Sequence, residues 1–342
     1  MPKSNIPLRT VHNLHFSRQV TKSIPLKNGH IAAKLWGNSQ DRPILALHGW
    51  QDNAGTWDPL APMITKDRSL LAIDFPGHGL SSWIPAGMMY HQWELPRIIL
   101  HLKEYFKWDK VSLLSHSMGA IAGMRYSCLY PDDVDFYIAI DSLIYDDYDL
   151  NLVIEKYPEY IRKGLIAQSR LDEEPPAYPL EELKKIWNRG TNNSVSIEST
   201  QFLIERGVLQ SKKDPNKYYF SRDARLKYVL FNPENKQFIE GLIRRLKCPT
   251  LYVKAIDSPY SSDEYSVEMR DILEQNNPNY ELHFVPGTHH VHLNDPEKVA
   301  PLILNFLSKH KTKALEPGEG YRILLKYFRG QHFIEGEAAR GS

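Results

Sequence analysis

The residue with the clearest chemical potential is Ser117, at the centre of the sequence SHSMG at residues 115–119. An apolar stretch typical of a buried strand, residues 111–114, runs directly into this sequence, and a helical pattern follows it. A tight strand-to-helix turn of this kind presents a serine hydroxyl as a nucleophile, and it needs small residues two positions before and after the serine. Ser115 and Gly119 supply them, although Ser115 stands where glycine is usual. Serine and glycine also occur at ordinary strand-to-helix turns. The motif alone therefore does not identify a nucleophile, and the other catalytic residues must be found elsewhere in the chain.

A serine nucleophile needs a neighbour that accepts its proton, because the pKa of its hydroxyl lies far above neutrality. The loop at residues 285–296 offers three histidines, His289, His290 and His292. Histidines at this spacing are also found in zinc sites, but no matching pair of carboxylates or thiolates stands out elsewhere in the sequence, so we expect no metal. We therefore predict that one of the three is a general base, and we prefer His289.

A catalytic histidine needs a carboxylate that fixes its tautomer and stabilises its cation. Asp141 and Asp257 each follow an expected strand, and either could instead cap a turn or a helix. The chain order Ser117, Asp257, His289 agrees with a nucleophile, an acid and a base at successive strand ends of this type of sheet. We predict Asp257 as the acid and keep Asp141 as the alternative.

The backbone amides that would stabilise a developing oxyanion are expected at two turns. Acyl-transfer sites of this kind take one donor from the residue after the nucleophile, here Met118, and another from the loop after an earlier strand. The sequence His48-Gly49-Trp50 ends an apolar stretch at residues 44–47, which makes the amide of Trp50 the second donor. We expect His48 to organise this loop rather than to carry protons.

The strands and helices that would position these residues follow from the apolar pattern. Short apolar runs recur with helical patterns between them, as expected for strands buried on both faces of a parallel sheet. The runs are residues 44–47, 70–73, 111–114, 136–140, 251–253 and 282–285. Asn28-Gly29 predicts an antiparallel hairpin ahead of them. Residues 295–310 predict a final helix that Pro301 either kinks or delays. The fold class is therefore α/β.

One long interval interrupts this alternation. Residues 142–246 are rich in charged residues, tyrosine and proline, with helical patterns and no clear buried strand, which is typical of an insertion. We therefore divide the chain into a core at residues 1–141 and 247–310, the insertion, and a tail of unknown role at residues 311–342. Aromatic residues of the insertion are expected to roof an apolar pocket over Ser117, or else to form a small core of their own. They are Tyr145, Tyr148, Trp187, Tyr218 and Tyr219.

The composition narrows the range of partners. The 342 residues carry 42 lysines and arginines against 41 acidic residues, a net charge of +1, so no charge excess favours nucleic acid or an anionic membrane. Two cysteines are too few for a disulfide framework and favour a reducing compartment. No apolar run reaches the length of a membrane span, and the first residues lack the pattern of a secretory signal. We expect a cytoplasmic protein that uses no cofactor.

Four motifs, in order, resemble the α/β-hydrolase superfamily and, within it, the serine hydrolase-like proteins of animals. They are HGWQDNAGTW at residues 48–57, DFPGHGLSS at 74–82, SHSMG at 115–119 and GTHHVHL at 287–293. The resemblance implies a mostly parallel, eight-stranded sheet flanked by helices, with a helical cap inserted after the sixth strand, and it implies that His289 is the base. It also allows a peroxisomal location, although the chain shows no C-terminal peroxisomal signal. The family's natural substrates are poorly defined, so the resemblance names none.

Together these observations predict a serine hydrolase that cleaves a small, apolar carboxylic ester through an acyl-enzyme. Ser117 attacks, His289 shuttles the proton, and Asp257 orients the imidazole. Haloalkane dehalogenases and epoxide hydrolases share the capped architecture but use a carboxylate nucleophile, so Ser117 argues against both. A thioester or carbon–carbon bond hydrolase would use the same triad. A ligand receptor on a hydrolase fold, with slow or absent turnover, is the alternative from another class. The sequence does not indicate the oligomeric state.

Overall fold

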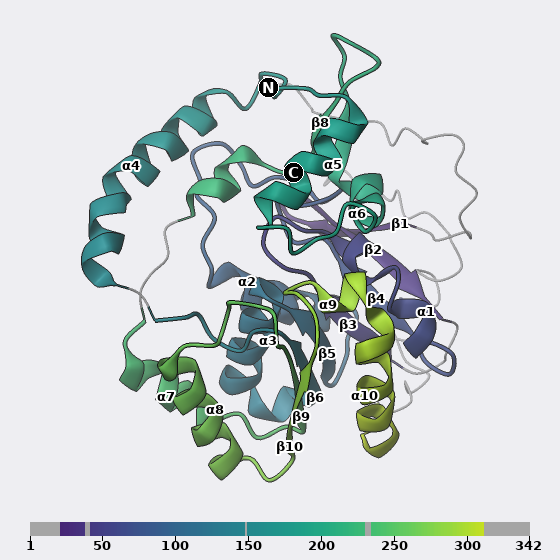
Figure 1. Cartoon of the computed structure of the whole chain (residues 1–342), viewed down its shortest axis with the longest axis vertical. Coiled ribbons are helices and arrows are strands. Elements are labelled where there is room, and N and C mark those ends of the chain that lie inside the picture. Colours follow the sequence, from purple (N-terminus) through teal and green to yellow (C-terminus); the bar gives the residue numbers. More distant parts are fainter. Residues whose placement is uncertain (1–20, 38–41, 148, 230–233, 311–342) are drawn as a thin grey trace, which may run out of the picture.

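The computed structural model describes residues 21–37, 42–147, 149–229 and 234–310, and its centre is one large sheet (Figure 1). The sheet has eight strands in the order β1-β2-β4-β3-β5-β6-β9-β10. β1 is antiparallel to β2 and β2 to β4, while all other neighbours are parallel. In chain order the strands are β1 (Thr21–Leu26), β2 (Gly29–Trp36), β3 (Ile44–Leu47), β4 (Leu70–Ile73), β5 (Val111–His116), β6 (Val134–Ile140), β9 (Thr250–Ala255) and β10 (Tyr280–Val285). This architecture confirms the predicted α/β class and its mostly parallel, eight-stranded sheet.

The parallel strands form at the short apolar runs of the sequence. Every residue of β3, β4, β5 and β9 is buried, which is the pattern expected of a sheet covered by helices on both faces. The opening hairpin also forms, but its turn residues are Lys27 and Asn28, one position earlier than expected. Leu26 pairs with Gly29 across this turn, and the φ of 137° at Gly29 explains why glycine begins β2.

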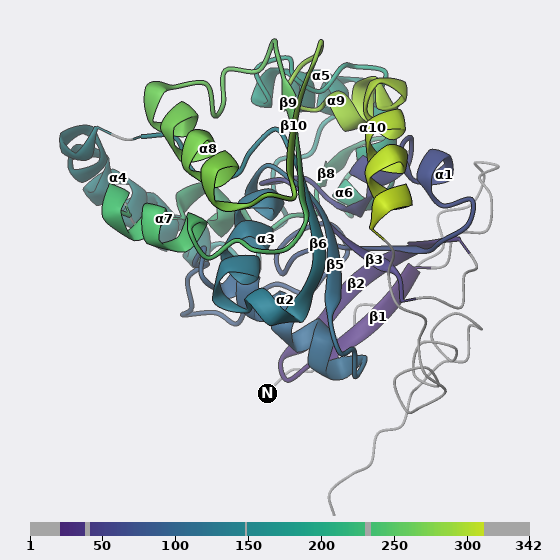
Figure 2. The same ribbon diagram turned by 90° about the horizontal axis from the view of Figure 1, so that it is seen from below.

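Helices cover the two faces of the sheet and divide the core into two apolar clusters (Figure 2). One cluster joins α2, α3, α7 and α8 to one face through residues such as Leu102, Met124 and Leu273. The other joins α1 and α10 to the opposite face through Ile64 and Ile303. Alternate residues of a strand belong to the two clusters, because successive side chains point to opposite faces. The bounds are α1 (Ala61–Ile64), α2 (Glu94–Tyr105), α3 (Met118–Leu129), α7 (Lys236–Ile243), α8 (Glu264–Asn276) and α10 (Pro296–Lys309).

Most of the interval between β6 and β9 forms a separate group of elements. They are α4 (Leu150–Ser169), α5 (Leu180–Gly190), α6 (Thr200–Gly207), β7 (Val208–Gln210), β8 (Tyr218–Phe220) and the 3-10 helix η3 (Ala224–Tyr228). Trp187, Val195 and Leu203 form a small apolar cluster of this group, which Leu293 joins from the core. In contrast, α7 packs into the main cluster through Ile239. We therefore propose that the cap-like part of the insertion expected at residues 142–246 ends before α7.

The last helix, α10, begins at Pro296 and continues through Pro301, whereas the sequence predicted a kink or a later start. Proline is favourable at the first helical position, where its missing N–H needs no partner. Pro301 lies on the exposed side of the helix, so the carbonyl that loses its donor there remains within reach of water. Asp295 occupies the N-cap position without a capping hydrogen bond, and its carboxylate lies 3.2 Å from the Lys298 ammonium. The expected tail at residues 311–342 lies outside the described residues.

A buried ion pair ties α6 to the end of β4. The Arg206 Nη2 atom donates to Asp74 Oδ2 at 2.7 Å, and the two side chains are 3% and 0% exposed. The same carboxylate accepts the backbone N–H of Ala54 at 2.7 Å and that of Leu80 at 2.8 Å. Asp74 therefore connects two turns at the end of the sheet with the inserted group of elements.

We expect Arg206→Met to lower the free energy of unfolding by about 3–5 kcal/mol, because the substitution leaves the Asp74 carboxylate buried without its counter-charge. Urea unfolding followed by circular dichroism measures this loss. Arg189→Met is the matched control, since it breaks an ion pair with Glu182 whose side chains are 62% and 40% exposed. Exposed pairs of this kind contribute less than about 1 kcal/mol. Equal losses in both variants would contradict the role of the buried pair.

Candidate active site

Ser117 lies on a tight turn between β5 and α3, as the sequence predicted. Its backbone has φ 51° and ψ −121°, a strained conformation for a residue with a Cβ atom. A Cβ atom at Gly119 would lie 2.4 Å from the carbonyl oxygen of Leu47, so only glycine fits there. Ser115 is fully buried under the turn. The turn therefore requires the small residues on both sides of Ser117 and places its hydroxyl at the carboxyl end of the sheet.

His289 meets Ser117 from the loop after β10. Its Nε2 atom lies 2.8 Å from Ser117 Oγ, and its Nδ1 atom lies 2.6 Å from Asp141 Oδ2. The tautomer that satisfies both contacts carries its proton on Nδ1, so that Nδ1–H donates to the carboxylate and Nε2 accepts from the serine hydroxyl. This arrangement leaves the serine next to a base that can remove its proton.

Asp141, and not Asp257, contacts the imidazole, which corrects the acid predicted from the sequence. Asp141 follows the last residue of β6, is fully buried, and has φ 54°. Its Oδ1 atom accepts hydrogen bonds from Lys254 Nζ at 2.9 Å and from the backbone N–H of Ala255 at 2.8 Å. Asp257 is exposed, and its carboxylate instead accepts the backbone N–H of Gly287 at 3.0 Å. It therefore supports the loop that leads to His289 without reaching the ring.

The reason for this difference lies in the order of the strands. β6 lies between β5, which carries Ser117, and β9, which precedes Asp257. A residue directly after β6 is therefore closer to the serine than one beyond β9. The chain also continues past Ala255, the end of β9, for one more residue before Asp257, and this turn carries the carboxylate to the surface.

The loop after β3 lies against the serine turn. A Cβ atom at Gly49 would lie 3.2 Å from Ser117 Cβ, so the backbone that leads to Trp50 passes beside the nucleophile. The Trp50 side chain is 47% exposed, and its Nε1 donates to the carbonyl oxygen of Leu226 in η3 at 3.1 Å. Met118 is the first residue of α3, where backbone N–H groups lack partners within the helix. Both amides expected to stabilise an oxyanion thus belong to segments that meet at Ser117.

His48 holds this loop in place, as the sequence predicted. Its Nε2 atom accepts the backbone N–H of Phe75 at 2.9 Å, and its Nδ1 lies 2.7 Å from the carbonyl oxygen of Gly49. Burial lowers the pKa of His48 to about 4, so the ring stays neutral at physiological pH. The ring therefore connects the ends of β3 and β4 without a role in proton transfer.

The other two histidines of the loop bind other hydroxyl groups. His290 Nδ1 lies 2.8 Å from Ser194 Oγ, and His292 Nε2 lies 2.8 Å from Thr56 Oγ1. Burial lowers the pKa of His292 to about 3 and that of His290 well below its ordinary value. His289 lies within hydrogen-bond distance of both a hydroxyl and a carboxylate, whereas the second ring nitrogen of His290 lies 3.9 Å from the nearest Asp52 oxygen, beyond hydrogen-bond distance.

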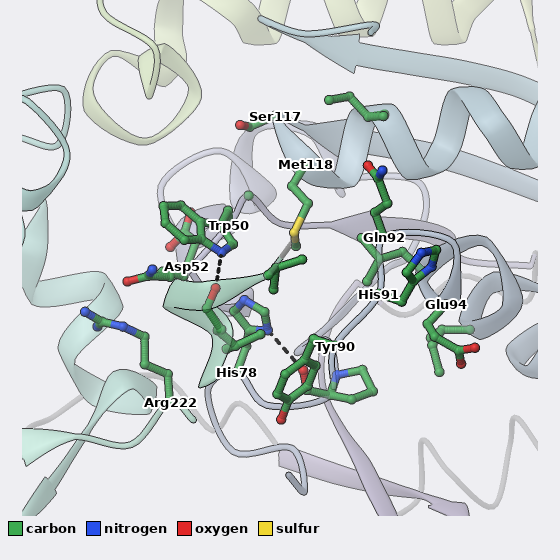
Figure 3. A pocket seen from close by; sticks show the side chains of 18 of the residues that line it. Trp50, Asp52, His78, Tyr90, His91, Gln92, Glu94, Ser117, Met118 and Arg222 are labelled. Atoms are coloured by element: carbon green, nitrogen blue, oxygen red, sulfur yellow. Dashed lines mark hydrogen bonds between the residues drawn. The ribbon is translucent and has the colours of Figure 1, made fainter. Parts of the chain in front are cut away.

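Ser117 and His289 line a cavity of about 840 Å³. Figure 3 shows part of its lining, with Ser117, Trp50 and Arg222 labelled. Much of its wall is apolar, and part of it comes from the second half of the loop between β4 and α2, after the motif at residues 74–82. The role of this half of the loop was missed from the sequence. That loop contributes Trp83, Ile84, Met88 and Met89. The sequence signal that could have revealed this wall is a group of apolar residues in a loop, where they are not needed to cover a strand or a helix. Of the expected aromatic roof, Tyr145 and Trp187 line the cavity, whereas Tyr148 lies outside the described residues.

One charged residue in this wall was also missed from the sequence. Arg222 lines the cavity, and its guanidinium carbon lies 3.9 Å from the ring centroid of Phe220. Its Nε atom is buried without a hydrogen-bond partner, and within the described part of the chain no carboxylate pairs with it. Burial lowers the pKa of Arg222 to about 10, so the group remains charged at neutral pH. In the described part of the chain, the largely apolar cavity wall therefore contains a positive charge without a counter-charge.

This architecture is that of a hydrolase with the α/β-hydrolase fold, and the chain belongs to that family: the family model for the alpha/beta hydrolase fold matches residues 42–296. A probable serine hydrolase of Drosophila melanogaster is 33% identical over 84% of this chain and 87% of its own length. Serine hydrolase-like protein 2 of Homo sapiens is 32% identical over 82% of this chain and 91% of its own. The predicted resemblance to the serine hydrolase-like proteins is thus confirmed.

Solved structures agree with this assignment. A hypothetical protein of Pseudomonas aeruginosa PAO1 is 31% identical, covers 84% of this chain and 98% of its own, and superposes with a TM-score of 0.70. The thioesterase domain from the curacin biosynthetic pathway covers 84% of this chain and 100% of its own with a TM-score of 0.69. At 19% identity the latter shows the shared fold alone. Within the described ranges, no helix combines the length and apolar character needed to cross a membrane.

Proposed function

We propose that this hydrolase cleaves a carboxylic ester through an acyl-enzyme, with Ser117 as nucleophile, His289 as general base and Asp141 as the acid that orients it. The observation that carries the proposal is the unbroken series of contacts from Ser117 Oγ through the imidazole to the buried Asp141 carboxylate, at 2.8 and 2.6 Å. At the Ser117 end of this series lies a cavity that is large enough for a small-molecule substrate.

In the acylation step His289 Nε2 takes the proton of the Ser117 hydroxyl while Oγ forms a bond to the ester carbonyl carbon. The carbonyl oxygen becomes an oxyanion, which the amides of Trp50 and Met118 stabilise. The imidazolium is stabilised by Asp141 and returns its proton to the alkoxide that leaves when the carbon–oxygen bond breaks. The product alcohol departs and the acyl group remains on Ser117.

Deacylation repeats these steps with water as the nucleophile. His289 removes a proton from the water as its oxygen attacks the acyl carbon, and the same amides stabilise the second oxyanion. The proton then passes from His289 to Ser117 Oγ as the acyl–enzyme bond breaks, which releases the carboxylic acid and restores the hydroxyl.

Labelling with a fluorophosphonate probe tests this proposal directly. The probe reacts with activated serines, so peptide mass analysis is expected to place the adduct on Ser117. Turnover of a panel of aryl esters, thioesters and carbon–carbon bond substrates then separates the reaction types that share this triad. A protein that binds the probe but turns over none of the panel would instead support the receptor alternative.

The unpaired charge at Arg222 refines the expected substrate. The apolar wall suits an apolar acyl chain, and we propose that Arg222 receives a carboxylate at the far end of that chain. A hydrogen bond between charged groups contributes about 1.5–3 kcal/mol, or roughly 10- to 100-fold in kcat/KM. The preferred substrate would then be the monoester of a dicarboxylic acid, whose charged end departs from the apolar ester expected from the sequence.

We expect Arg222→Met to lower kcat/KM for the nitrophenyl monoester of adipic acid by roughly 10- to 100-fold. The rate with nitrophenyl hexanoate, which has the same chain length and no terminal charge, should change by less than about threefold. Arg97→Met is the matched control, because Arg97 also lines the cavity but is 61% exposed and pairs with Glu94. Equal losses with both esters would show that Arg222 shapes the cavity without binding a charge.

A further inference from the structure

A second group of polar side chains lies beneath the serine turn. Asp52 comes from the loop after β3, His116 is the last residue of β5, and His290 follows His289 in the loop after β10. These three side chains are buried, with exposed fractions of 4%, 0% and 7%. One ligand atom from each lies within 4.8 Å of the others. Three elements far apart in the sequence thus bring a carboxylate and two imidazoles together.

The hydrogen bonds of His116 determine which of its nitrogens is free. Its Nε2 atom lies 2.8 Å from the carbonyl oxygen of His289, and a carbonyl only accepts, so the ring proton is on Nε2. The Nδ1 atom therefore carries a lone pair, and within the described part of the chain this buried atom has no hydrogen-bond partner. The carbonyl of His289 fixes the tautomer in the way that outer partners orient metal-binding histidines.

Asp52 contributes a second acceptor without a donor to this cluster. Its Oδ1 atom accepts the backbone N–H of Asn53 at 2.9 Å, whereas its Oδ2 atom is buried and has no hydrogen-bond partner among the described residues. His290 Nε2 lies 3.9 Å from this Oδ2 atom, and the opposite ring nitrogen of His290 is held by Ser194 Oγ. Among the described residues, His116 Nδ1 and Asp52 Oδ2 are thus two buried acceptors without a donor. His290 Nε2 joins them as a third acceptor in the tautomer whose Nδ1–H donates to Ser194 Oγ, and a cation would satisfy this arrangement.

We propose that Asp52, His116 and His290 bind one divalent transition-metal ion of the Zn²⁺ class, whose remaining coordination position faces the cavity. Two imidazoles and one carboxylate are ligands typical of zinc and unlike the oxygen-only sets of magnesium or calcium. All three residues line the cavity, which gives the ion a route of entry. No metal was expected from the sequence, because no pair of carboxylates or thiolates matched the loop histidines, but the fold brings Asp52 and His116 beside His290.

The chemistry of the ligands suits coordination. Burial lowers the pKa values of His116 and His290 well below their ordinary value, so both rings are neutral and can donate lone pairs to a metal. Tetrahedral coordination at 2.0–2.1 Å places ligand atoms about 3.3 Å apart. The ligand atoms here lie within 4.8 Å of one another, so they must move closer together when the ion binds. The rival occupants are a buried water and a proton on Asp52, whose pKa burial raises to about 7.

Titration of the chelator-treated, full-length protein with ZnCl₂ by isothermal calorimetry tests the proposal. We expect one ion per chain, and we expect CoCl₂ to give the visible d–d absorption of a tetrahedral site. Asp52→Asn and His290→Gln should each weaken Zn²⁺ binding by more than tenfold. Ser194→Ala, which removes only a supporting hydrogen bond, should weaken it by roughly 10- to 100-fold and covers the case in which a ligand variant fails to fold.

Two controls distinguish this site from its surroundings. Ser117→Ala should retain Zn²⁺ binding, because the proposed ligands do not include the serine, and His283→Gln should retain it because that histidine is on β10 and partly exposed. Absence of binding by the unsubstituted protein would assign the cluster to water or a proton and overturn the proposal. So would binding that depends on Ser117, or binding that survives Asp52→Asn, His290→Gln and Ser194→Ala. None of these readouts depends on the proposed ester hydrolysis.

Discussion

Ser117→Ala is expected to lower kcat for ester hydrolysis by about four to six orders of magnitude, the loss seen when other triads lose their nucleophile. Alanine has no oxygen to attack the carbonyl carbon, and the amides of Trp50 and Met118 can only stabilise an oxyanion that forms without an acyl-enzyme. The residual rate should therefore approach that of water attack in the cavity. Initial rates with a nitrophenyl ester, measured on protein of confirmed mass, give the result.

The matched control for this substitution is Ser115→Ala. Ser115 belongs to the same turn and is fully buried, and its hydroxyl has no hydrogen-bond partner in the described part of the chain. Removing that hydroxyl should leave kcat within about tenfold, since it contacts neither His289 nor the cavity. Both variants should melt near the temperature of the unsubstituted protein. Undiminished ester cleavage by Ser117→Ala, or a fluorophosphonate adduct on another serine, would overturn the assignment of the nucleophile.

The fold was predictable because its signals are local. Runs such as residues 44–47 and 70–73 are apolar without alternation, and both form strands with every residue buried, so sequence and structure agree almost residue by residue. The extent of the insertion was harder to predict. α7 has the same helical pattern as its neighbours, and only tertiary packing of Ile239 against the sheet places it with the core.

Within the site, Ser117 and His289 were predictable because each lies in a short motif whose geometry is set by a tight turn. The carboxylate that contacts His289 was not predictable, because Asp141 and Asp257 both follow parallel strands, and chain order cannot tell which turn points inward. The roles proposed for Asp52 and Arg222 were missed for a related reason. They depend on contacts between distant segments, at the serine turn and in the cavity wall, which the neighbouring residues in the sequence do not indicate.

The second large effect on kcat is expected from the substitution of Asp141, the proposed acid. Asp141→Asn should lower kcat by about 10⁴, because an amide cannot hold the Nδ1–H tautomer of His289 or stabilise the imidazolium. KM should change little, since the carboxylate does not line the cavity. Asp257→Asn should keep kcat within about tenfold. Asparagine can still accept the Gly287 N–H that Asp257 accepts at 3.0 Å, and the side chain does not reach the imidazole.

Stability must be separated from catalysis in this test, because Asp141 also neutralises a buried lysine. Lys254 Nζ lies 2.9 Å from Asp141 Oδ1, and both side chains are buried, so Asp141→Asn alone leaves a buried ammonium without a counter-charge. That loss costs about 3–5 kcal/mol of unfolding free energy. The double variant Asp141→Asn with Lys254→Met removes both charges and should recover much of the stability. If kcat stays about 10⁴ lower in this double variant while its melting temperature rises above that of Asp141→Asn, the loss of kcat results from the missing contact with the imidazole and not from unfolding. If kcat recovers with stability, or if Asp257→Asn is the more damaging change in a folded protein, Asp141 is not the catalytic acid.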